Sequence, residues 1–401
     1  DNFLKENNNA EQILRLYWNS DEQLQQLHDD FIENTVSNYY MPFGIAPNFI
    51  INHKHYTVPM AIEESSVVAA ASLVAKFWSD KGGFKTEVLN TTKVGQIHFM
   101  YTGAKEELEN YFKNKKESLL QVTEAITLNM RKRGGGILNI ELRDKTADLD
   151  NYYQIHVTFE TKDSMGANFI NSCLEAMASE FRNESIEIVM SILSNYVPDC
   201  LVKATVSCTV DKLHPTSGAL FAKKMVQAVA IANVEPHRAV THNKGIMNGI
   251  DAVVIATGND FRAVEAGIHA FAARDGKYKS LTECAVVDNV FTFSITVPLA
   301  LGTVGGLTSS HPLSKLSLEM LHNPSAKELM QVIAAAGLAQ NYAALRALTT
   351  TGIQEGHMKM HLVNILNQLN ATTNEKELVK HALKGKVVSH SGVAEELQKL
   401  R

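Results

Sequence analysis

A lysine set among glycines and followed by an apolar run is the feature that most constrains this chain. The stretch reads Thr241-His242-Asn243-Lys244-Gly245-Ile246-Met247-Asn248-Gly249-Ile250, and the turn Thr257-Gly258-Asn259-Asp260 follows it. Glycines expose the backbone and leave little side chain to shield an ammonium group. We therefore expect a glycine-rich loop that places Lys244 and Asp260 at the edge of buried structure, where a low dielectric strengthens each charge. A structural ion pair and a catalytic pair both fit this pattern.

A second polar junction, Ile62-Glu63-Glu64-Ser65-Ser66, joins an extended segment to a small-residue helix expected over 67–76. A serine there suits the N-cap of the helix, and acidic residues suit its dipole. Alternatively, a Glu64 buried beside an apolar helix would have a raised pKa and donate a proton. The residues alone leave both interpretations open.

Composition excludes several classes of protein. The 401 residues are enough for two or three domains. The chain has no apolar run of about 18 residues, so we expect no membrane span. The net charge of −5 and the lack of a basic block do not favour nucleic acid as a partner. Four cysteines without a CxxC pair indicate reduced thiols and a cytoplasmic protein. His357 and His361 lack the context of a metal motif, so we expect no metal.

Alternating strands and amphipathic helices predict an α+β unit over roughly 90–200. Its expected elements include one long helix over 106–129 and a last strand over 201–210. Between a strand and a helix lies a turn, made of Asp163, Ser164, Met165, Gly166, Ala167 and Asn168. A glycine and a helix N-terminus suit the approach of a phosphate, although a plain turn with a cap fits as well.

The remaining segments give further expectations. Residues 1–30 predict one or two amphipathic helices with buried stripes that include Ile13 and Leu16. The glycines of 302–306 permit a close approach by backbone or ligand, and the alanine-rich helix over 334–348 suits the core or a subunit interface. His357 lies between apolar and glycine residues, where either packing or the role of a mobile general acid is possible.

Taken together, these motifs resemble the 3-hydroxy-3-methylglutaryl-CoA (HMG-CoA) reductases of class II. The resemblance rests on motifs in family order: Glu33-Asn34-Thr35, VPMAIEE (58–64), SVVAAAS (66–72), DSMGAN (163–168), THNKGIMNGI (241–250), ATGND (256–260), GTVGG (302–306), GLAQNYAALRAL (337–348) and GHM (356–358). Three serines depart from the family pattern: Ser65 replaces a proline, Ser164 an alanine and Ser37 a glycine. None of them is at an expected catalytic position.

The resemblance implies an α+β fold with three domains. A large, helix-rich, substrate-binding and dimerisation domain would comprise 1–90 and 198–350. A small α/β cofactor-binding domain would be inserted at 91–197, and a C-terminal helical flap would comprise 351–401. The resemblance also implies a homodimer or a higher even oligomer, with active sites at the subunit interface.

The resemblance implies site residues too. Glu64, Lys244, Asp260 and His357 would form the catalytic set. Ser66, Arg238, Asn248 and Asn195 would contact the hydroxymethylglutaryl group, and the 163–168 turn would bind the cofactor. Lys244, held by Asp260 and Glu64, would stabilise the oxyanion that each hydride transfer creates. Glu64 would protonate the aldehyde oxygen, and His357 would protonate the departing CoA thiolate.

The expected partners are HMG-CoA and a nicotinamide cofactor, with neither nucleic acid nor a membrane. Arg131, Lys132 and Arg133 favour NADPH slightly over NADH, because a 2′-phosphate is bound by basic residues, although a solvated basic turn fits as well. Two alternatives remain open from the residues: an enzyme that uses Lys244 as a Schiff-base nucleophile, and a non-catalytic protein that binds CoA esters.

Overall fold

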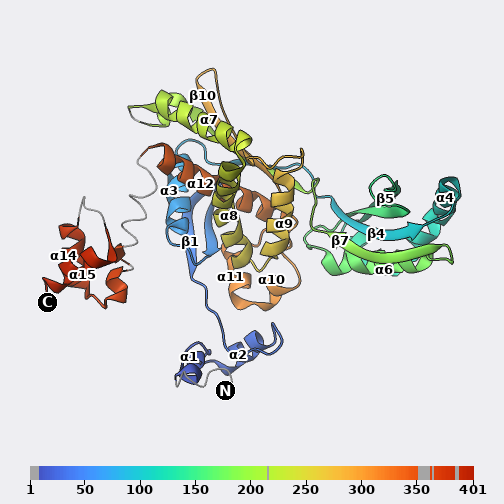
Figure 1. Cartoon of the computed structure of the whole chain (residues 1–401), viewed down its shortest axis with the longest axis horizontal. Coiled ribbons are helices and arrows are strands. Elements are labelled where there is room, and N and C mark those ends of the chain that lie inside the picture. Colours follow the sequence, from blue (N-terminus) through green and yellow to red (C-terminus); the bar gives the residue numbers. More distant parts are fainter. Residues whose placement is uncertain (1–8, 215, 351–361, 364, 384–387) are drawn as a thin grey trace.

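The chain folds into helices and antiparallel sheets arranged as a central body with three smaller parts around it (Figure 1). The computed structural model describes residues 9–214, 216–350, 362–363, 365–383 and 388–401. Buried apolar residues fall into three clusters, one within 46–345, one within 97–186 and one within 362–397. The mixed α and β composition expected from the sequence is confirmed.

The central body combines two sheets with a set of packed helices. Its strands form a hairpin, β1-β2, and a four-stranded sheet in the order β3-β8-β10-β9. The strands are β1 (Phe43–Ile51), β2 (Lys54–Ala61), β3 (Lys85–Val88), β8 (Leu201–Thr209), β9 (Thr282–Val287) and β10 (Val290–Pro298). The helices are α3 (Val67–Ser79), η1 (Val210–Lys212), α7 (Gly218–Val234), α8 (Pro236–Ala256), α9 (Phe261–Ala272), α10 (Leu307–Ser310), α11 (Pro312–Met320) and α12 (Ala326–Thr349).

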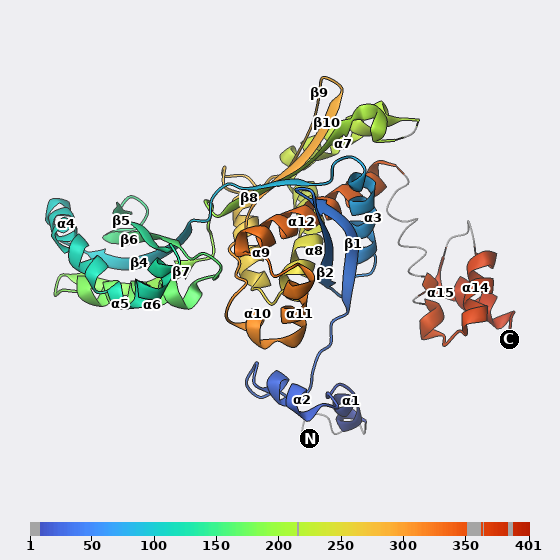
Figure 2. The same cartoon turned by 180° about the vertical axis from the view of Figure 1, so that it is seen from behind.

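The crossing of α8 and α12 lies at the centre of this body (Figure 2). A Cβ on Gly249 of α8 would lie 2.7 Å from the carbonyl oxygen of Ala336, and one on Gly337 of α12 would lie 2.7 Å from Ile250. Residues 241–250 lie inside the helix α8, so the prediction of a glycine-rich loop there is wrong. Gly249 is required because two helix backbones meet there, and this contact outweighs its poor helix propensity.

The two expectations for the alanine-rich helix and the N-terminal helices have different outcomes. α12 is largely buried within its own chain, so most of its alanines belong to the core. The N-terminal helices α1 (Ala10–Leu16) and α2 (Glu22–Asp29) form as expected. Their apolar stripes are not buried, however, because Ile13 is 48% and Leu16 79% exposed in this chain.

The second part is a four-stranded sheet in the order β5-β6-β4-β7, with helices α4, α5 and α6 packed on one face (Figure 2). Its elements are β4 (Lys93–Tyr101), α4 (Lys105–Gln121), α5 (Glu124–Lys132), β5 (Gly136–Asp144), β6 (Tyr152–Glu160), α6 (Ala167–Phe181) and β7 (Ile186–Ser194).

Two details of this part differ from the sequence prediction. The expected single helix over 106–129 is two helices, because Thr123 starts a new one and its hydroxyl bonds back to the carbonyl of Leu120. The expected last strand, 201–210, is β8. It pairs with β3 and β10 of the central body and not with the small sheet.

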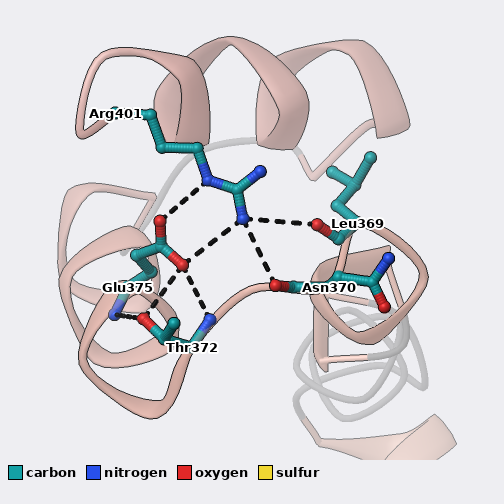
Figure 3. A network of polar contacts seen from close by, with 5 residues as sticks. All are labelled: Leu369, Asn370, Thr372, Glu375 and Arg401. Carbon is teal, nitrogen blue, oxygen red and sulfur yellow. Dashed lines mark hydrogen bonds and ion pairs between the residues drawn. The ribbon is translucent and has the colours of Figure 1, made fainter.

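The C-terminal part is held by an ion pair and a helix cap (Figure 3). It includes α14 (Thr373–Ala382) and α15 (His390–Gln398). The Arg401 guanidinium donates to Glu375 at 2.8 Å and to the carbonyls of Leu369 and Asn370. Glu375 also accepts from Thr372, which completes a capping box at the start of α14. Together, Arg401 and Thr372 hold the pKa of Glu375 down at about 2.

Candidate active site

The structure brings Lys244 and Glu64 together, although they are far apart in the sequence. Lys244 lies in the middle of α8, and Glu64 lies in the turn before α3. The lysine Nζ donates to Glu64 Oε2 at 2.7 Å. The Lys244 side chain is 60% exposed and that of Glu64 36%, so the expectation of a buried Glu64 is not met in the isolated chain. An ion pair this exposed contributes little to folding, and its geometry is available to a ligand.

Buried polar side chains fix the part of α8 that carries Lys244. Asn243 donates to the carbonyl of Lys279 at 2.8 Å and accepts from the N–H of Leu281 at 3.1 Å. His242 bonds through Nε2 to the Thr282 hydroxyl at 2.7 Å, and burial lowers the pKa of His242 to about 3. A neutral histidine and an asparagine thus anchor this turn of the helix. The sequence motif contained both residues but gave no signal of this role.

Ser66 has a left-handed backbone conformation, which residues other than glycine rarely adopt. It occupies the N-cap position of α3 with φ +78°, and its hydroxyl makes no capping hydrogen bond. A non-glycine residue at positive φ costs of order 1 kcal/mol or more, and such residues concentrate at functional sites. The N-cap interpretation therefore predicted the position of Ser66 correctly, but the expected capping hydrogen bond from its hydroxyl is not formed.

The expected substrate residues share a property. Within the described chain, their side chains make no hydrogen bond or ion pair: Ser66, Arg238, Asn248 and Asn195. Arg238 and Asn248 lie on α8, on either side of Lys244 in the sequence, and both are only partly buried. Partly buried polar groups usually have partners in the folded chain. The side chains of Arg238 and Asn248, unpaired in the described chain and on the helix that carries Lys244, are therefore available to a polar ligand.

Asp260 lies at the N-cap of α9 and does not contact Lys244 in this chain. Its Oδ1 accepts from the N–H groups of Arg262 and Ala263 and from Arg262 Nε, the last at 3.1 Å. Burial opposes ionisation, but the Arg262 guanidinium and the backbone donors outweigh it and hold the pKa of Asp260 below its usual value. The expected contact between Asp260 and Lys244 is not formed, because the helix cap and Arg262 hold the carboxylate. The fourth expected catalytic residue, His357, lies outside the described residues.

The 163–168 turn is built into the central body. Asp163 Oδ1 accepts from the N–H of Ala326, the first residue of α12, at 2.8 Å, and the Asp163 carbonyl accepts from Thr303 at 2.8 Å. Gly302 allows this contact, because a Cβ there would lie 2.6 Å from the N atom of Met165. The glycine loop over 302–306 thus allows a close approach by the backbone of the 163–168 turn, which is one of the two expectations from the sequence. Gly166 starts α6 at φ +91°.

Sequence reasoning missed Lys93, whose side chain hydrogen-bonds to this turn. Lys93 is buried at the start of β4, and its Nζ donates to Thr161 Oγ1 at 2.5 Å and to the carbonyl of Ser164 at 2.7 Å. Burial lowers the pKa of Lys93. A lysine that opens an alternating strand looks like a surface residue in the sequence, so no signal pointed to it.

A cavity connects the turn with the helix that Asp260 begins. It is lined by Lys93, Met165, Ala167, Asn195, Ala263 and Gly267, among others. Gly267 lets α9 approach the backbone of Asn195 closely, because a Cβ at Gly267 would lie 2.7 Å from the Asn195 carbonyl oxygen. Three of the residues expected from the sequence, Met165, Ala167 and Asn195, therefore face one space.

Comparison with known proteins decides the family. A family model described as hydroxymethylglutaryl-coenzyme A reductase matches residues 2–362. The chain belongs to the hydroxymethylglutaryl-coenzyme A reductase family. It is 39% identical over 353 residues to a 3-hydroxy-3-methylglutaryl-coenzyme A reductase of Archaeoglobus fulgidus, which covers 88% of this chain and 80% of the relative. A probable reductase of Borreliella burgdorferi is 36% identical over 364 residues, with coverage of 89% and 83%.

Solved structures of the family agree with this assignment. A class II reductase from Streptococcus pneumoniae bound to NADPH in open conformations matches with a TM-score of 0.77 and 38% identity, over 81% of this chain and 89% of the other. A second structure of the reductase from that organism reaches a TM-score of 0.79 at 36% identity, with coverage of 94% and 90%. The resemblance inferred from the motifs is thus confirmed. In the described part of the chain, no helix is long and apolar enough to cross a membrane.

Proposed function

We propose that Lys244 and Glu64 form the reacting centre of an HMG-CoA reductase that converts HMG-CoA into mevalonate and free CoA. The observation that carries this proposal is the 2.7 Å contact between the two side chains, with the amide of Asn248, unpaired in the described chain, one helical turn from Lys244 on α8. The reaction needs two hydride transfers. The first converts the thioester into a hemithioacetal that expels CoA thiolate, and the second converts the resulting aldehyde into the alcohol.

Lys244 suits the role of oxyanion stabiliser. Each hydride transfer moves an electron pair onto a carbonyl oxygen, and a positioned cation lowers the energy of that charge. An ammonium group has three N–H donors, of which one is directed at Glu64 in this structure. The others remain for the carbonyl oxygen of the substrate. Because His242 and Asn243 anchor this turn of α8, the backbone position of Lys244 is fixed.

The carboxyl groups have separate roles in the proposal. Glu64, already in hydrogen-bond contact with Lys244, donates a proton to the aldehyde oxygen in the second reduction. Asp260, which is held by Arg262 in this chain, would be the second acid of the site once it turns to the ammonium group. Its side chain is 34% exposed, and a carboxylate accepts about four hydrogen bonds, so it has capacity beyond its contacts with α9. His357 protonates the CoA thiolate that leaves after the first reduction.

Substrate and cofactor residues extend the same proposal. Ser66, Arg238, Asn248 and Asn195 bind the hydroxymethylglutaryl group, and Arg238 provides the cation for its carboxylate. The 163–168 turn fits a dinucleotide, because Gly166 lets backbone approach at the N-terminus of α6 and a cavity lined by Met165, Ala167 and Asn195 lies beside it. The nicotinamide supplies the hydride in both steps. We propose NADPH, which the S. pneumoniae relative binds, with Arg131 and Arg133 exposed for its 2′-phosphate.

A homodimer or a higher even oligomer with sites at the interface is also part of the proposal. The helices α1 and α2 contain no buried residue, and apolar side chains around them are exposed: Ile13, Leu14, Leu16, Tyr17, Trp18, Ile32, Val36, Tyr39, Tyr40 and Met41. An apolar surface of this extent is typical of an interface. A second copy of the chain would cover it.

The three buried clusters support the proposed domains, 1–90 with 198–350, then 91–197, then 351–401. A cytoplasmic location is proposed as well. Its support is that Cys173, Cys200, Cys208 and Cys284 are all free of disulfides.

The test is the oxidation of reduced nicotinamide by the purified protein. We expect oxidation that depends on HMG-CoA and is faster with NADPH than with NADH at equal, subsaturating concentrations. Borohydride is then added to a protein and HMG-CoA mixture without nicotinamide. Covalent trapping of the substrate on Lys244 in place of nicotinamide oxidation would support a Schiff-base enzyme and overturn the proposal.

A further inference from the structure

A chain of four titratable side chains lies between α8 and α9, away from the groups assigned above. Asp251 of α8 and Glu265 of α9 hydrogen-bond to each other through their carboxyl groups. Glu265 Oε2 lies 2.6 Å from His269 Nε2, one turn further along α9. His269 Nδ1 in turn bonds to the hydroxyl of Tyr278 at 2.7 Å. The chain runs from the mostly buried carboxyl group of Asp251, through the partly exposed imidazole of His269, to the phenol of Tyr278.

Two facing carboxyl groups can hydrogen-bond only if one of them retains a proton. The environment decides which one does. Asp251 Oδ1 is buried without a partner, so an ionised Asp251 would leave a charge without solvation. Burial, and then the adjoining Glu265, raise the pKa of Asp251 to about 9. Glu265 is the opposite case, because hydrogen bonding from His269 keeps the pKa of Glu265 below its usual value. Asp251 is therefore the donor and Glu265 the acceptor.

Few other charges act on this pair. The titratable groups that face it are His269 on α9 and, beyond the imidazole, Tyr278 in the loop after α9. In the described part of the chain, no lysine or arginine lies within 4.0 Å of either carboxyl group. Burial and hydrogen bonding, including the contact of Glu265 with His269, are therefore the main influences on the pair.

The position of this hydrogen bond connects it to the proposed reaction. α8 carries Lys244 and Asn248, and α9 begins at Asp260, so the turn 257–260 joins the two helices that present these groups. Asp251 and Glu265 bond across the two helices on either side of that turn. Their hydrogen bond is thus a side-chain contact between the two helices that present Lys244 and Asp260.

We propose that Asp251 is a positioning residue that carries a proton: as a neutral acid it donates to Glu265, ties α8 to α9 and so aligns Lys244 with Asp260. The part of this inference that concerns Lys244 and Asp260 rests on the proposed function. The part that concerns the proton does not, and it is tested without substrate.

The first experiment measures unfolding of wild type and Asp251→Asn with pH. Below its folded pKa, native Asp251 holds a proton that the unfolded chain, with an ordinary aspartate, has released above about pH 4. Stability contributed by this group is thus lost as pH rises, by up to a tenfold fall in the folding constant per pH unit until the folded pKa is passed. Asparagine keeps the donor and has no proton to lose. We expect Asp251→Asn to lose less stability than wild type between about pH 6 and pH 8.5.

The second experiment measures kcat at about pH 7 for Asp251→Asn and Asp251→Ala, with Asp275→Asn as the control. Asp275 follows α9 and has a 58% exposed side chain, so this control removes a nearby carboxylate outside the pair. We expect Asp251→Ala to lose about tenfold or more in kcat, with an unchanged KM for NADPH, and Asp251→Asn to recover most of that loss.

Either of two results overturns the inference. Parallel pH dependence of stability in wild type and Asp251→Asn would show that Asp251 holds no proton. A folded Asp251→Ala with the kcat of wild type would show that the pair positions nothing. A wild type that does not oxidise NADPH with HMG-CoA would refute the proposed function and with it the alignment of Lys244 and Asp260, while the pH experiment would still decide the protonation of Asp251.

Discussion

Replacing Lys244 by alanine separates a catalytic role from a structural one, because the structure predicts very different magnitudes for the two. The Lys244–Glu64 pair is 60% and 36% exposed, and exposed ion pairs contribute about 0–1 kcal/mol to stability. An oxyanion stabiliser, in contrast, contributes about 2.7–4 kcal/mol to the transition state, or roughly 10²–10³ in kcat. Lys244→Ala should therefore unfold at nearly the same denaturant concentration as wild type while losing at least about 10²-fold in kcat.

The chain offers a matched control for this experiment. Lys54 pairs with Glu328 at 3.1 Å, with side chains 66% and 39% exposed, so it reproduces the exposure of the Lys244 pair without including any proposed catalytic residue. Nicotinamide oxidation and urea unfolding are measured for Lys54→Ala and Lys244→Ala in parallel. We expect Lys54→Ala to keep wild-type kcat. The reasoning is refuted if the activity lost in Lys244→Ala equals its unfolded fraction, or if Lys54→Ala loses as much.

Three further predictions follow from the fold and the proposed mechanism. Gly249→Ala should lower the free energy of unfolding by about 1–3 kcal/mol, because the added Cβ would overlap the backbone of Ala336. Gly245→Ala should raise the free energy of unfolding by about 0.5–1 kcal/mol, because its added Cβ would have its nearest neighbour at 3.9 Å and alanine favours a helix. Chemical denaturation of both variants checks these values. His357→Gln should slow reduction of HMG-CoA by roughly 10²-fold and reduction of added mevaldehyde much less, since mevaldehyde has no thiolate to protonate. Equal losses on both substrates would contradict that role. Light scattering should give a particle of at least twice the 44.2 kDa chain, and a fully active monomer would exclude sites at an interface.

The sequence predicted most of the secondary structure, because its apolar periodicity is strong and its breakers are clear. The helix α3 lies where the sequence placed a small-residue helix over 67–76, β2 is the extended segment before it, and β4, β5, β6 and α6 lie within the α+β unit expected over roughly 90–200. The error at 241–250 has a physical cause. Local propensity assigns glycines to loops, but Gly249 is selected by a helix that approaches from a distant part of the chain.

The candidate site was predictable to a smaller extent. The motifs named Lys244 and Glu64, and the structure confirms that these two side chains meet. The partner of Asp260 was not predictable, because Arg262 competes for the carboxylate through a helix cap that becomes visible only in three dimensions. The buried positions of Lys93 and Asp251 were hidden for the same reason. A charged residue in a sequence gives no sign of its burial, which depends on segments that pack from elsewhere.

The stoichiometry of a single assay tests the central claim most directly. Reduced nicotinamide consumed and CoA thiol released are measured in the same reaction with limiting HMG-CoA, for wild type and Lys244→Ala. The account predicts that two molecules of NADPH are oxidised for each CoA released, because the aldehyde formed by the first transfer is reduced in the second. It predicts no release of CoA without nicotinamide. One NADPH per CoA, or release of CoA without oxidation, would contradict the two-step reduction at Lys244.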